Sequence, residues 1–561
     1  MTEVVSEPMW SAQVTPVTTA DRDRLRASGQ WASTTLRQAL ADAAQRFPDR
    51  VALVGRRHAG GRDELSYREF DLAAHDAAGR LAALGLGPDD VVAMMLPNCV
   101  EYPTILFGIN EIGAIYTGIP VAYGGLQAAA VLRNSRARAM IIPRRWRSSD
   151  HVALVRRLRE QLPSLEFVVV VDDDDMPLEV TEAGEHRWRE LTASATLPPV
   201  PQPDQLCYLG FTSGTTGEPK GAMHSHETLL HPADALFDHL GVEAFGDPMM
   251  QLVGSPAGHH TGFVWGILFT LRHGGTGVHL DVWDADWASQ VIREERATTM
   301  FGAPTFLQDL MRTDLAGDST CPLMSVVVAG SSIPRGLPER AGRSLSALIA
   351  PAWGMTECGI LTSTTAKDSG AALHTDGTPT AGSEIRAVGP DGTVLGPGEV
   401  GDLEIRGPGV TLGYYNRPDA TREAFASGNW FRTGDTASID AEGRLEIHGR
   451  TKDIIIRGGE NIPVADVESV ILDDPAVEEA AVVGYPDPRL GERACAVLVL
   501  RSGSTMNLPT LNARLEAAGL SRHYLPERLL ILDAMPMTPS GKIQKFRLRE
   551  QVRENESRSE P

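Results

Sequence analysis

The sequence predicts an α/β protein with mostly parallel sheets, followed by a β-rich segment and a small α+β unit. Three observations support this fold class. Helical and strand patterns alternate over roughly the first 375 residues, and glycine-rich turns then separate short strands up to about residue 450. The remaining stretch of about 110 residues has the size of a compact domain. A chain of 561 residues is also expected to contain two or three domains.

The alternation of helical and strand patterns is strongest in the first 375 residues. Residues 1–30 are polar, and we expect them to form an arm on the surface. Apolar residues at helical spacing then predict a helix over 34–47: Leu36, Leu40, Ala43 and Phe47. Further helices are expected over 66–84 and 102–112, and strands over 51–55, 90–96, 139–142, 167–171 and 325–329. Gly85 is placed to end helix 66–84.

Two features of the same region bear on its surroundings. The unbroken apolar run 167–171 suits a sheet that is covered on both faces. The four-acid run 172–175 follows it directly. A metal site is conceivable there, but a solvated turn is the stronger interpretation.

The pattern of expected helices and strands changes near residue 376, where the C-terminal third of the chain begins. Short strands are predicted there over 384–388, 401–406, 436–439 and 444–447, which indicates a mainly β subdomain over about 376–450. Beyond Arg450 we expect helices over 465–472 and 511–518, and strands over 477–483, 494–500 and 528–532. No internal repeat is found.

Composition excludes several function classes. The formal charge of −21 argues against non-specific binding to nucleic acid. The five cysteines are scattered without CxxC spacing, which suggests reduced thiols in a cytoplasm. Neither a secretory signal nor an apolar run of about 18 residues is present, so we expect no membrane anchor.

The most informative run is 211–221, FTSGTTGEPKG. Glycine permits a loop whose backbone N–H groups surround a polyphosphate, hydroxyl side chains add donors, and Lys220 adds positive charge. The run is not a Walker A loop, because Pro219 precedes the lysine and Gly221 follows it. A flexible linker is the weaker alternative, since an apolar strand precedes the run.

This run resembles the phosphate-binding signature of the adenylate-forming enzymes, which include acyl-CoA synthetases, luciferases and peptide-synthetase adenylation domains. These enzymes join a carboxylate to AMP and usually transfer the acyl group to a thiol. The resemblance implies a catalytic role for Thr212 and ATP-binding roles for the rest of the loop: Ser213, Gly214, Thr215, Thr216, Gly217 and Lys220.

The run 352–358, AWGMTEC, extends the resemblance. It implies that Glu357 binds Mg²⁺, which prefers oxygen ligands, and that Thr356 contacts phosphate. The family usually has Tyr where this chain has Trp353, and either aromatic could stack on adenine. Standing alone, the motif would be a surface turn. The remaining nucleotide contacts implied are Ala352, Gly354 and Met355, with an adenine loop at Gly330, Ser331 and Ser332.

Two later motifs complete the nucleotide site. In 430–435, WFRTGD, Asp435 could accept both ribose hydroxyls from a fixed turn, although TGD alone is a common turn. In 449–462, Arg450 could bind ribose or phosphate, and the family pattern places the interdomain hinge at Lys452. The resemblance brings Gly458, Gly459 and Glu460 near a pantetheine tunnel.

A lysine near the C-terminus is the key catalytic candidate. In 539–545, PSGKIQK, Lys542 matches the family lysine that contacts the carboxylate and α-phosphate during adenylation. A lone lysine there would ordinarily be solvated.

The acyl pocket is expected around the run SPAGHHTGF. His259 should border the acyl carboxylate, with His260 the weaker candidate. We expect the pocket to be lined by His259, Phe263, Val264, Gly330 and Gly354. Trp265, in the same segment 259–266, also indicates an apolar acid. A zinc site at His224, His226, His259 and His260 lacks recognisable ligand spacing and is disfavoured.

The resemblance spans about residues 30–550, with its motifs in family order. It implies a large N-terminal domain over 31–450, made of two α/β sheet subdomains and the β-rich subdomain, and a small mobile C-terminal lid over 451–561. Short segments of the sequence are most similar to those of bacterial medium-chain fatty-acid and cyclohexanecarboxylate CoA ligases. ATP, Mg²⁺, coenzyme A and an apolar carboxylic acid are therefore the expected ligands, and a homodimer is possible.

Two rival functions stay open. One is an acyl-adenylate-forming enzyme that loads a carrier protein or feeds amide formation. The other is a non-catalytic ATP- or acyl-sensing protein, against which the intact Glu357, Asp435 and Lys542 argue.

Overall fold

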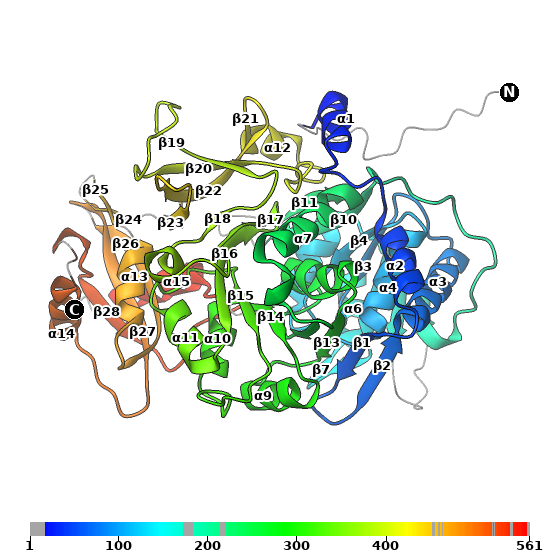
Figure 1. Cartoon of the computed structure of the whole chain (residues 1–561), viewed down its shortest axis with the longest axis horizontal. Coiled ribbons are helices and arrows are strands. Elements are labelled where there is room, and N and C mark those ends of the chain that lie inside the picture. Colours follow the sequence, from blue (N-terminus) through cyan, green and yellow to red (C-terminus); the bar gives the residue numbers. More distant parts are fainter. Residues whose placement is uncertain are drawn as a thin grey trace.

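The computed structural model describes residues 17–171, 183–212, 219–450, 455–457, 460–462, 464–487, 489–518, 520, 522–538 and 542–557. Several features singled out from the sequence lie outside the described residues: the acidic run 172–175, Ser213, Gly214, Thr215, Thr216, Gly217, Lys452, Gly458 and Gly459. The described chain forms two large sheets, a β-rich unit and a C-terminal unit that lies at one end of the molecule (Figure 1).

The first large sheet has seven strands in the order β11-β10-β4-β3-β5-β8-β9. They are β3 (Val91–Met94), β4 (Ile115–Gly118), β5 (Ala139–Pro143), β8 (Phe167–Val171), β9 (Glu185–Arg187), β10 (Leu206–Thr212) and β11 (Lys220–Ser225). Neighbours are parallel, except that β10 pairs antiparallel with β11. Along β8, Val169 joins one core cluster while Val168 and Val170 join another. The sheet is therefore covered on both faces, as its apolar run predicts.

The second large sheet has nine strands in the order β18-β17-β16-β15-β14-β12-β13-β1-β2. They are β1 (Val51–Arg56), β2 (Arg62–Ser66), β12 (Met250–Val253), β13 (Thr276–Leu280), β14 (Thr299–Gly302), β15 (Ser325–Val328), β16 (Leu348–Met355), β17 (Gly359–Ser363) and β18 (Thr378–Pro379). The strands from β1 to β16 in this order are parallel, and both edges are antiparallel.

Helices form layers around these sheets. The core cluster that touches both sheets is filled by α2 (Leu36–Arg46), α3 (Tyr67–Ala83), α4 (Glu101–Glu111), α7 (His226–Leu240), the π-helix η3 (Thr261–Leu268) and α8 (Phe269–Arg272). The outer face of the first sheet is covered by α5 (Gly125–Ser135) and α6 (His151–Arg159). A short hairpin of β6 (Arg145–Trp146) and β7 (Ser149–Asp150) directly precedes α6. The outer face of the second is covered by α9 (Ala285–Glu294), α10 (Pro304–Leu310) and α11 (Leu337–Leu345). The α/β fold class is thus confirmed.

The β-rich unit is a five-stranded antiparallel sheet with its own core cluster. Its elements are β19 (Glu384–Val388), β20 (Gly401–Arg406), α12 (Pro418–Ala424), β21 (Phe425–Ala426), β22 (Trp430–Ile439) and β23 (Leu445–Arg450). One expectation was wrong in detail. Asp435 lies inside the long strand β22 rather than in a turn, because β22 pairs with β20 and β23 on either side.

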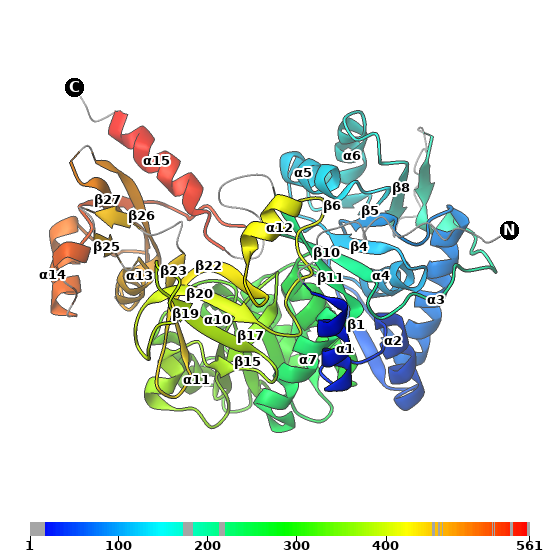
Figure 2. The same cartoon turned by 90° about the horizontal axis from the view of Figure 1, so that it is seen from above.

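The C-terminal unit is a small α+β fold, as expected. It contains β24 (Ile455–Arg457), β25 (Glu460–Ile462), α13 (Val464–Leu472), β26 (Val477–Asp487), β27 (Gly491–Leu500), α14 (Leu508–Ala517), β28 (Arg528–Ile531) and α15 (Lys545–Ser557). Figure 2 shows this unit beside the second large sheet and away from the first. Ion pairs join it to the large part: Arg312–Glu478 at 2.8 Å and Arg340–Asp473 at 2.7 Å.

The N-terminal arm contains a helix that the sequence did not predict. Helix α1 (Thr19–Ala27) starts at a capping box formed by Thr18 and Asp21 and buries none of its residues. Arg26 holds it to the large part by binding Glu227, whose side chain is fully buried. No helix among the described residues is long and apolar enough to cross a membrane.

Candidate active site

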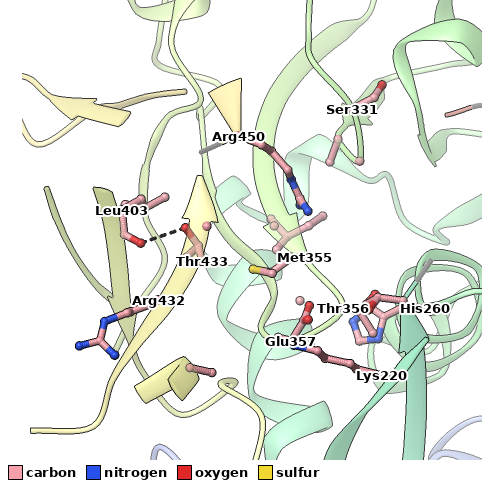
Figure 3. Close-up of a pocket in the computed structure, with 18 of the residues that line it drawn as sticks. Lys220, His260, Ser331, Met355, Thr356, Glu357, Leu403, Arg432, Thr433 and Arg450 are labelled. Atoms are coloured by element: carbon pink, nitrogen blue, oxygen red, sulfur yellow. Dashed lines mark hydrogen bonds between the residues drawn. The ribbon is translucent and has the colours of Figure 1, made fainter. Parts of the chain in front are cut away.

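One cavity of about 920 Å³ collects residues from distant segments of the chain. Its lining includes the following predicted site residues: Thr212, Lys220, His259, Gly330, Ser331, Gly354, Met355, Thr356, Glu357, Arg450 and Lys542. They come from β10 and β11, the segment before η3, the loop after β15, β16 and its following turn, β23, and the loop before α15. Figure 3 shows Lys220, His260, Thr356 and Glu357 gathered on one side of this cavity and Arg450 and Ser331 on another.

A second cavity of about 300 Å³ adjoins the first, since both are lined by Gly330, Ser331, Gly354, Arg450, Thr538 and Lys542. It adds four more predicted nucleotide contacts: Ser332, Ala352, Trp353 and Asp435. It also includes residues of α13 and of the loop before α15, so it lies where the C-terminal unit meets the large part. Glu460, a further predicted contact, lies in β25.

The acidic group at the phosphate side is Glu357, which is 4% exposed. The Tyr414 hydroxyl donates to its Oε1 at 2.9 Å, and Oε2 has no partner among the described residues. Burial raises the pKa of this carboxyl. The ammonium of Lys220 sits 5.0 Å from the centre of the Tyr414 ring, so cation, phenol and carboxylate follow one another along this wall. No motif in the sequence pointed to Tyr414.

An oxygen that is buried and unpaired suits a hard cation such as Mg²⁺. In the described part of the chain, no group of three or more His, Cys, Asp or Glu side chains is placed to hold a metal. A magnesium ion at Glu357 would therefore take its other ligands from substrate phosphates and water, which is a common arrangement for this ion.

The second buried carboxylate is Asp435, which is 4% exposed. Arg450 Nε lies 2.9 Å from its Oδ1, and the indole N–H of Trp353 donates to Oδ2 at 3.1 Å. The Asp435 amide donates to Thr433 Oγ1 at 3.0 Å, which fixes the backbone. Trp353 therefore orients Asp435 through its indole, a contact that the sequence did not indicate. Each carboxylate oxygen keeps lone pairs for a further donor.

The acyl side differs from the expected lining. Phe263 and Val264 do not line the cavity, although both are buried. Phe263 instead packs edge-on against Tyr116 and Tyr208 in the core between the sheets. Trp265 takes the place on the cavity wall, where it stacks on Phe301 with ring centres 5.7 Å apart.

Phe263, Val264 and Trp265 are consecutive residues of the π-helix Thr261–Leu268, so their side chains point to different sides, and of the three only Trp265 lines the cavity. The remaining apolar wall of this end comes from parallel strands of the second sheet and from β17: Gly302, Val327, Ala329 and Ile360.

The histidines near the cavity are neutral at neutral pH. Burial, together with the positive charge of Lys542, lowers the pKa of His259 to about 4. Burial lowers the pKa of His224 to about 4 as well, and its Nε2 lies 2.9 Å from the Thr356 carbonyl oxygen. His226 accepts from the Leu36 amide at 3.2 Å and so belongs to the core rather than to the cavity.

Lys542 stands between the acyl and nucleotide ends. Its amide donates to Thr538 Oγ1 at 3.0 Å, and its carbonyl accepts from the Thr538 amide at 2.7 Å. These two bonds hold Thr538 and Lys542 together, and Lys542 lines both cavities. The positive charge of the Lys542 ammonium acts to lower the pKa of His259 and that of Asp435.

Family models match most of the chain. The model described as "AMP-binding enzyme" matches residues 40–415, and the one described as "AMP-binding enzyme C-terminal domain" matches residues 466–542. The chain belongs to the AMP-binding enzyme family. It is therefore an adenylate-forming acid–thiol ligase, and the family resemblance read from its motifs is confirmed.

Similar proteins agree with this assignment. The chain is 33% identical to 2-hydroxy-7-methoxy-5-methyl-1-naphthoate–CoA ligase of Streptomyces carzinostaticus, over 94% of both chains. It is 30% identical to medium-chain fatty-acid–CoA ligase of Escherichia coli, over 95% of this chain and 93% of that one. Its fold matches ATP-bound MatB from Rhodopseudomonas palustris, with a TM-score of 0.81 and 25% identity over 93% of this chain and 100% of that one. Relatives include enzymes named as CoA ligases and one from Mycobacterium tuberculosis named salicyl-AMP ligase / salicyl-S-ArCP synthetase.

Proposed function

We propose that this protein is an ATP-dependent carboxylic acid–CoA ligase that activates an apolar acid, medium-chain or alicyclic, as an acyl-AMP. It then transfers the acyl group to coenzyme A. The observation that carries the proposal is the cavity in which Lys220, Glu357 and Lys542 meet an apolar wall at Trp265. Charged groups for a phosphate and a carboxylate thus face a compartment for an acyl chain.

In the first half-reaction the carboxylate attacks the α-phosphorus and pyrophosphate leaves. Such a reaction needs no protein nucleophile, because positioning and charge stabilisation lower the barrier. Lys220 and Thr212, with the loop 213–217, would hold the phosphates. Lys542 would neutralise charge that develops between the carboxylate and the α-phosphate. Mg²⁺ bound at Glu357 would add positive charge at the leaving pyrophosphate.

The nucleoside would lie between the two cavities. Asp435, held by Arg450 and Trp353, is positioned to accept hydroxyl donors from a ribose. The adenine would lie between Trp353 and the loop of Gly330, Ser331 and Ser332, with the backbone of Ala352 and Gly354 at its edge.

The body of the acid is proposed to be apolar. The distal wall is formed by Trp265, Phe301, Val327 and Ile360, and no carboxylate among the described residues lines that end to bind an α-amino group. This argues against activation of an amino acid. We propose that the Trp265–Phe301 stack, which lines this end, limits the chain length or ring of the acid.

For the second half-reaction we propose that the C-terminal domain, residues 451–561, rotates about Lys452 relative to the N-terminal domain, residues 31–450. The rotation would withdraw Lys542 and bring Gly458, Gly459 and Glu460 toward the acyl-AMP for thioester formation. Support comes from contacts between described residues of the two parts, which include the ion pairs Arg312–Glu478 and Arg340–Asp473 and a hydrogen bond from Arg335 N–H to Ser469 Oγ at 3.1 Å. Such contacts are exchanged readily.

The decisive experiment measures pyrophosphate release over a panel of short- to medium-chain, alicyclic and aryl acids, with and without coenzyme A. An acid that releases pyrophosphate and yields an acyl-CoA supports the proposal. Absence of pyrophosphate release with every acid would contradict it. Pyrophosphate release without any CoA ester, but with transfer to a carrier-protein pantetheine, would favour the carrier-loading alternative.

The protein is proposed to act in the cytoplasm, since all five of its cysteines are free. A homodimer is the oligomeric state to test by size-exclusion chromatography with light scattering.

A further inference from the structure

The cavity wall contains a polar side chain that an apolar acid leaves without a partner. His260 directly precedes the π-helix η3, lines the cavity and is 6% exposed. Neither of its ring nitrogens has a hydrogen-bond partner in the described part of the chain. A buried donor or acceptor without a partner destabilises the folded protein. An unpaired polar group in the wall of a binding cavity is explained if the bound ligand supplies its hydrogen-bond partner.

The neighbouring rings do not supply the missing partner. His224 lies with its ring centre 5.8 Å away, and its two nitrogens are engaged by Thr228 Oγ1 and the Thr356 carbonyl. Tyr208 also lies 5.8 Å away between ring centres, tilted by 33°. Burial, with His224 and His259 nearby, lowers the pKa of His260 far below its ordinary value. The ring is thus neutral and offers one N–H donor and one bare nitrogen. A hydroxyl group, which can accept and donate, matches either tautomer.

The position of His260 says which part of the acid it would meet. Figure 3 shows its ring beside Thr356, on the same side of the cavity as Glu357 and Lys220. The preceding residue, His259, is close enough to Lys542 to feel its charge. His260 therefore lies at the end of the cavity where the carboxylate reacts. The Trp265–Phe301 stack belongs to the apolar part of the wall.

We propose that the acid activated here carries a hydroxyl group on its β-carbon and that His260 binds this hydroxyl. The class includes 3-hydroxyalkanoic acids, 2-hydroxycycloalkanecarboxylic acids and ortho-hydroxyaryl acids, in which the hydroxyl has the same relation to the carboxyl. The proposal rests on the proposed function, specifies a hydroxyl substituent of the acid, and adds aryl acids to the medium-chain and alicyclic ones. The rest of the acid remains apolar and lies against the wall that Trp265 and Phe301 form.

The test compares matched pairs of acids that differ by one hydroxyl: octanoate with 3-hydroxyoctanoate, cyclohexanecarboxylate with its 2-hydroxy derivative, and benzoate with 2-hydroxybenzoate. kcat/KM is measured by pyrophosphate release. A site that pairs a hydroxyl discriminates strongly against the analogue that lacks it, so the hydroxylated member of the best pair should be preferred at least about tenfold.

Substitutions then locate the preference. His260→Leu should abolish it by lowering kcat/KM for the hydroxylated acid, whereas His260→Asn, which keeps a donor and an acceptor, should retain part of it. Trp265→Phe is the matched control: it changes the wall but should leave the ratio within each pair unchanged. Calorimetric binding of non-reactive acyl-sulfamoyl adenosines, with and without the hydroxyl, reads the same preference without turnover.

The outcomes separate the two proposals. If no acid of the panel releases pyrophosphate, the proposed function is wrong. If acids react but neither the rates nor the adenosine analogues distinguish the members of any pair, the hydroxyl proposal alone is wrong. A preference that survives in His260→Leu would also overturn it. Should that variant fail to fold, the comparison of pairs in the unaltered protein still decides.

Discussion

The contact between helix α1 and the large part of the molecule makes a quantitative stability prediction. Arg26 donates to both oxygens of Glu227, at 2.8 and 3.1 Å, and also lies 3.3 Å from Asp204. The Glu227 side chain is fully buried, whereas the Arg26 side chain is 31% exposed. Replacing Arg26 by Ala would leave a buried carboxylate without its cation.

The magnitude follows from this burial. Removing one partner of a fully buried ion pair costs roughly 3–5 kcal/mol. Because water reaches part of the Arg26 guanidinium, we expect a loss of about 2–3 kcal/mol in the free energy of unfolding for Arg26→Ala. Arg24 provides the control on the same helix: its side chain is 70% exposed and pairs with Asp21. Arg24→Ala should cost less than about 0.5 kcal/mol.

The assay is thermal and urea unfolding of the full chain, with the double variant Arg26→Ala/Glu227→Gln as a third sample. Glutamine carries no charge, so the double variant should recover at least half of the stability that the single variant loses. The reasoning is refuted if Arg26→Ala is as stable as Arg24→Ala, or if the double variant gains nothing over Arg26→Ala.

Four further outcomes are expected. Lys542→Ala should slow acyl-AMP formation about 100- to 1000-fold and leave thioester formation from supplied acyl-AMP nearly unchanged; an equal fall in both half-reactions would contradict domain alternation. Glu357→Gln should raise the Mg²⁺ concentration for half-maximal pyrophosphate release at least about tenfold, and an unchanged Mg²⁺ titration would remove this residue from the metal site. Trp265→Ala should shift the preferred acid toward longer chains in the pyrophosphate assay. An unchanged chain-length profile would show that the indole does not limit the cavity. Burial lowers the pKa of His279 to about 4 from an ordinary value of 6.5, so its contribution to stability is complete above pH 6.5 and is lost as the pH falls toward 4; His279→Leu should flatten the pH dependence of the urea midpoint in that window, and an unaltered slope would disprove this.

Much of the fold follows from local sequence patterns. The strands Phe167–Val171, Glu384–Val388 and Gly401–Arg406 have the bounds that the sequence predicts. Gly85, with a φ of 76°, directly follows the capping residue of α3. In each case the deciding signal is local: an apolar run, an alternation between turns, or a residue that tolerates a left-handed backbone.

Other features depend on contacts that local patterns do not contain. Helix α1 has no buried residue and is held by Arg26 to Glu227, 201 positions away. The apolar stretch Thr261–Leu268 has no polar face that would show its orientation. The sequence therefore could not show that, of Phe263, Val264 and Trp265, Trp265 is the one that lines the cavity.

The same limit applies to the site. The motifs indicated which residue types would gather, and the structure brings many of their described members to two adjoining cavities. No local pattern indicated Tyr414, because its role depends on a contact with Glu357, which lies 57 positions away in the chain. The turn expected at Asp435 lies instead within strand β22, where Asp435 pairs with Arg450 of β23, which TGD alone does not reveal.

Strand β16 has a consequence for how this enzyme could change over evolution or in the laboratory. Its last residues and the turn after it supply Ala352, Trp353, Thr356 and Glu357 in one rigid row, so nucleotide contacts keep a fixed spacing. Most of the acyl wall is contributed by the separate π-helix and by neighbouring strand ends. New acid preferences can therefore arise through exchanges in those segments while the nucleotide contacts of β16 stay unchanged.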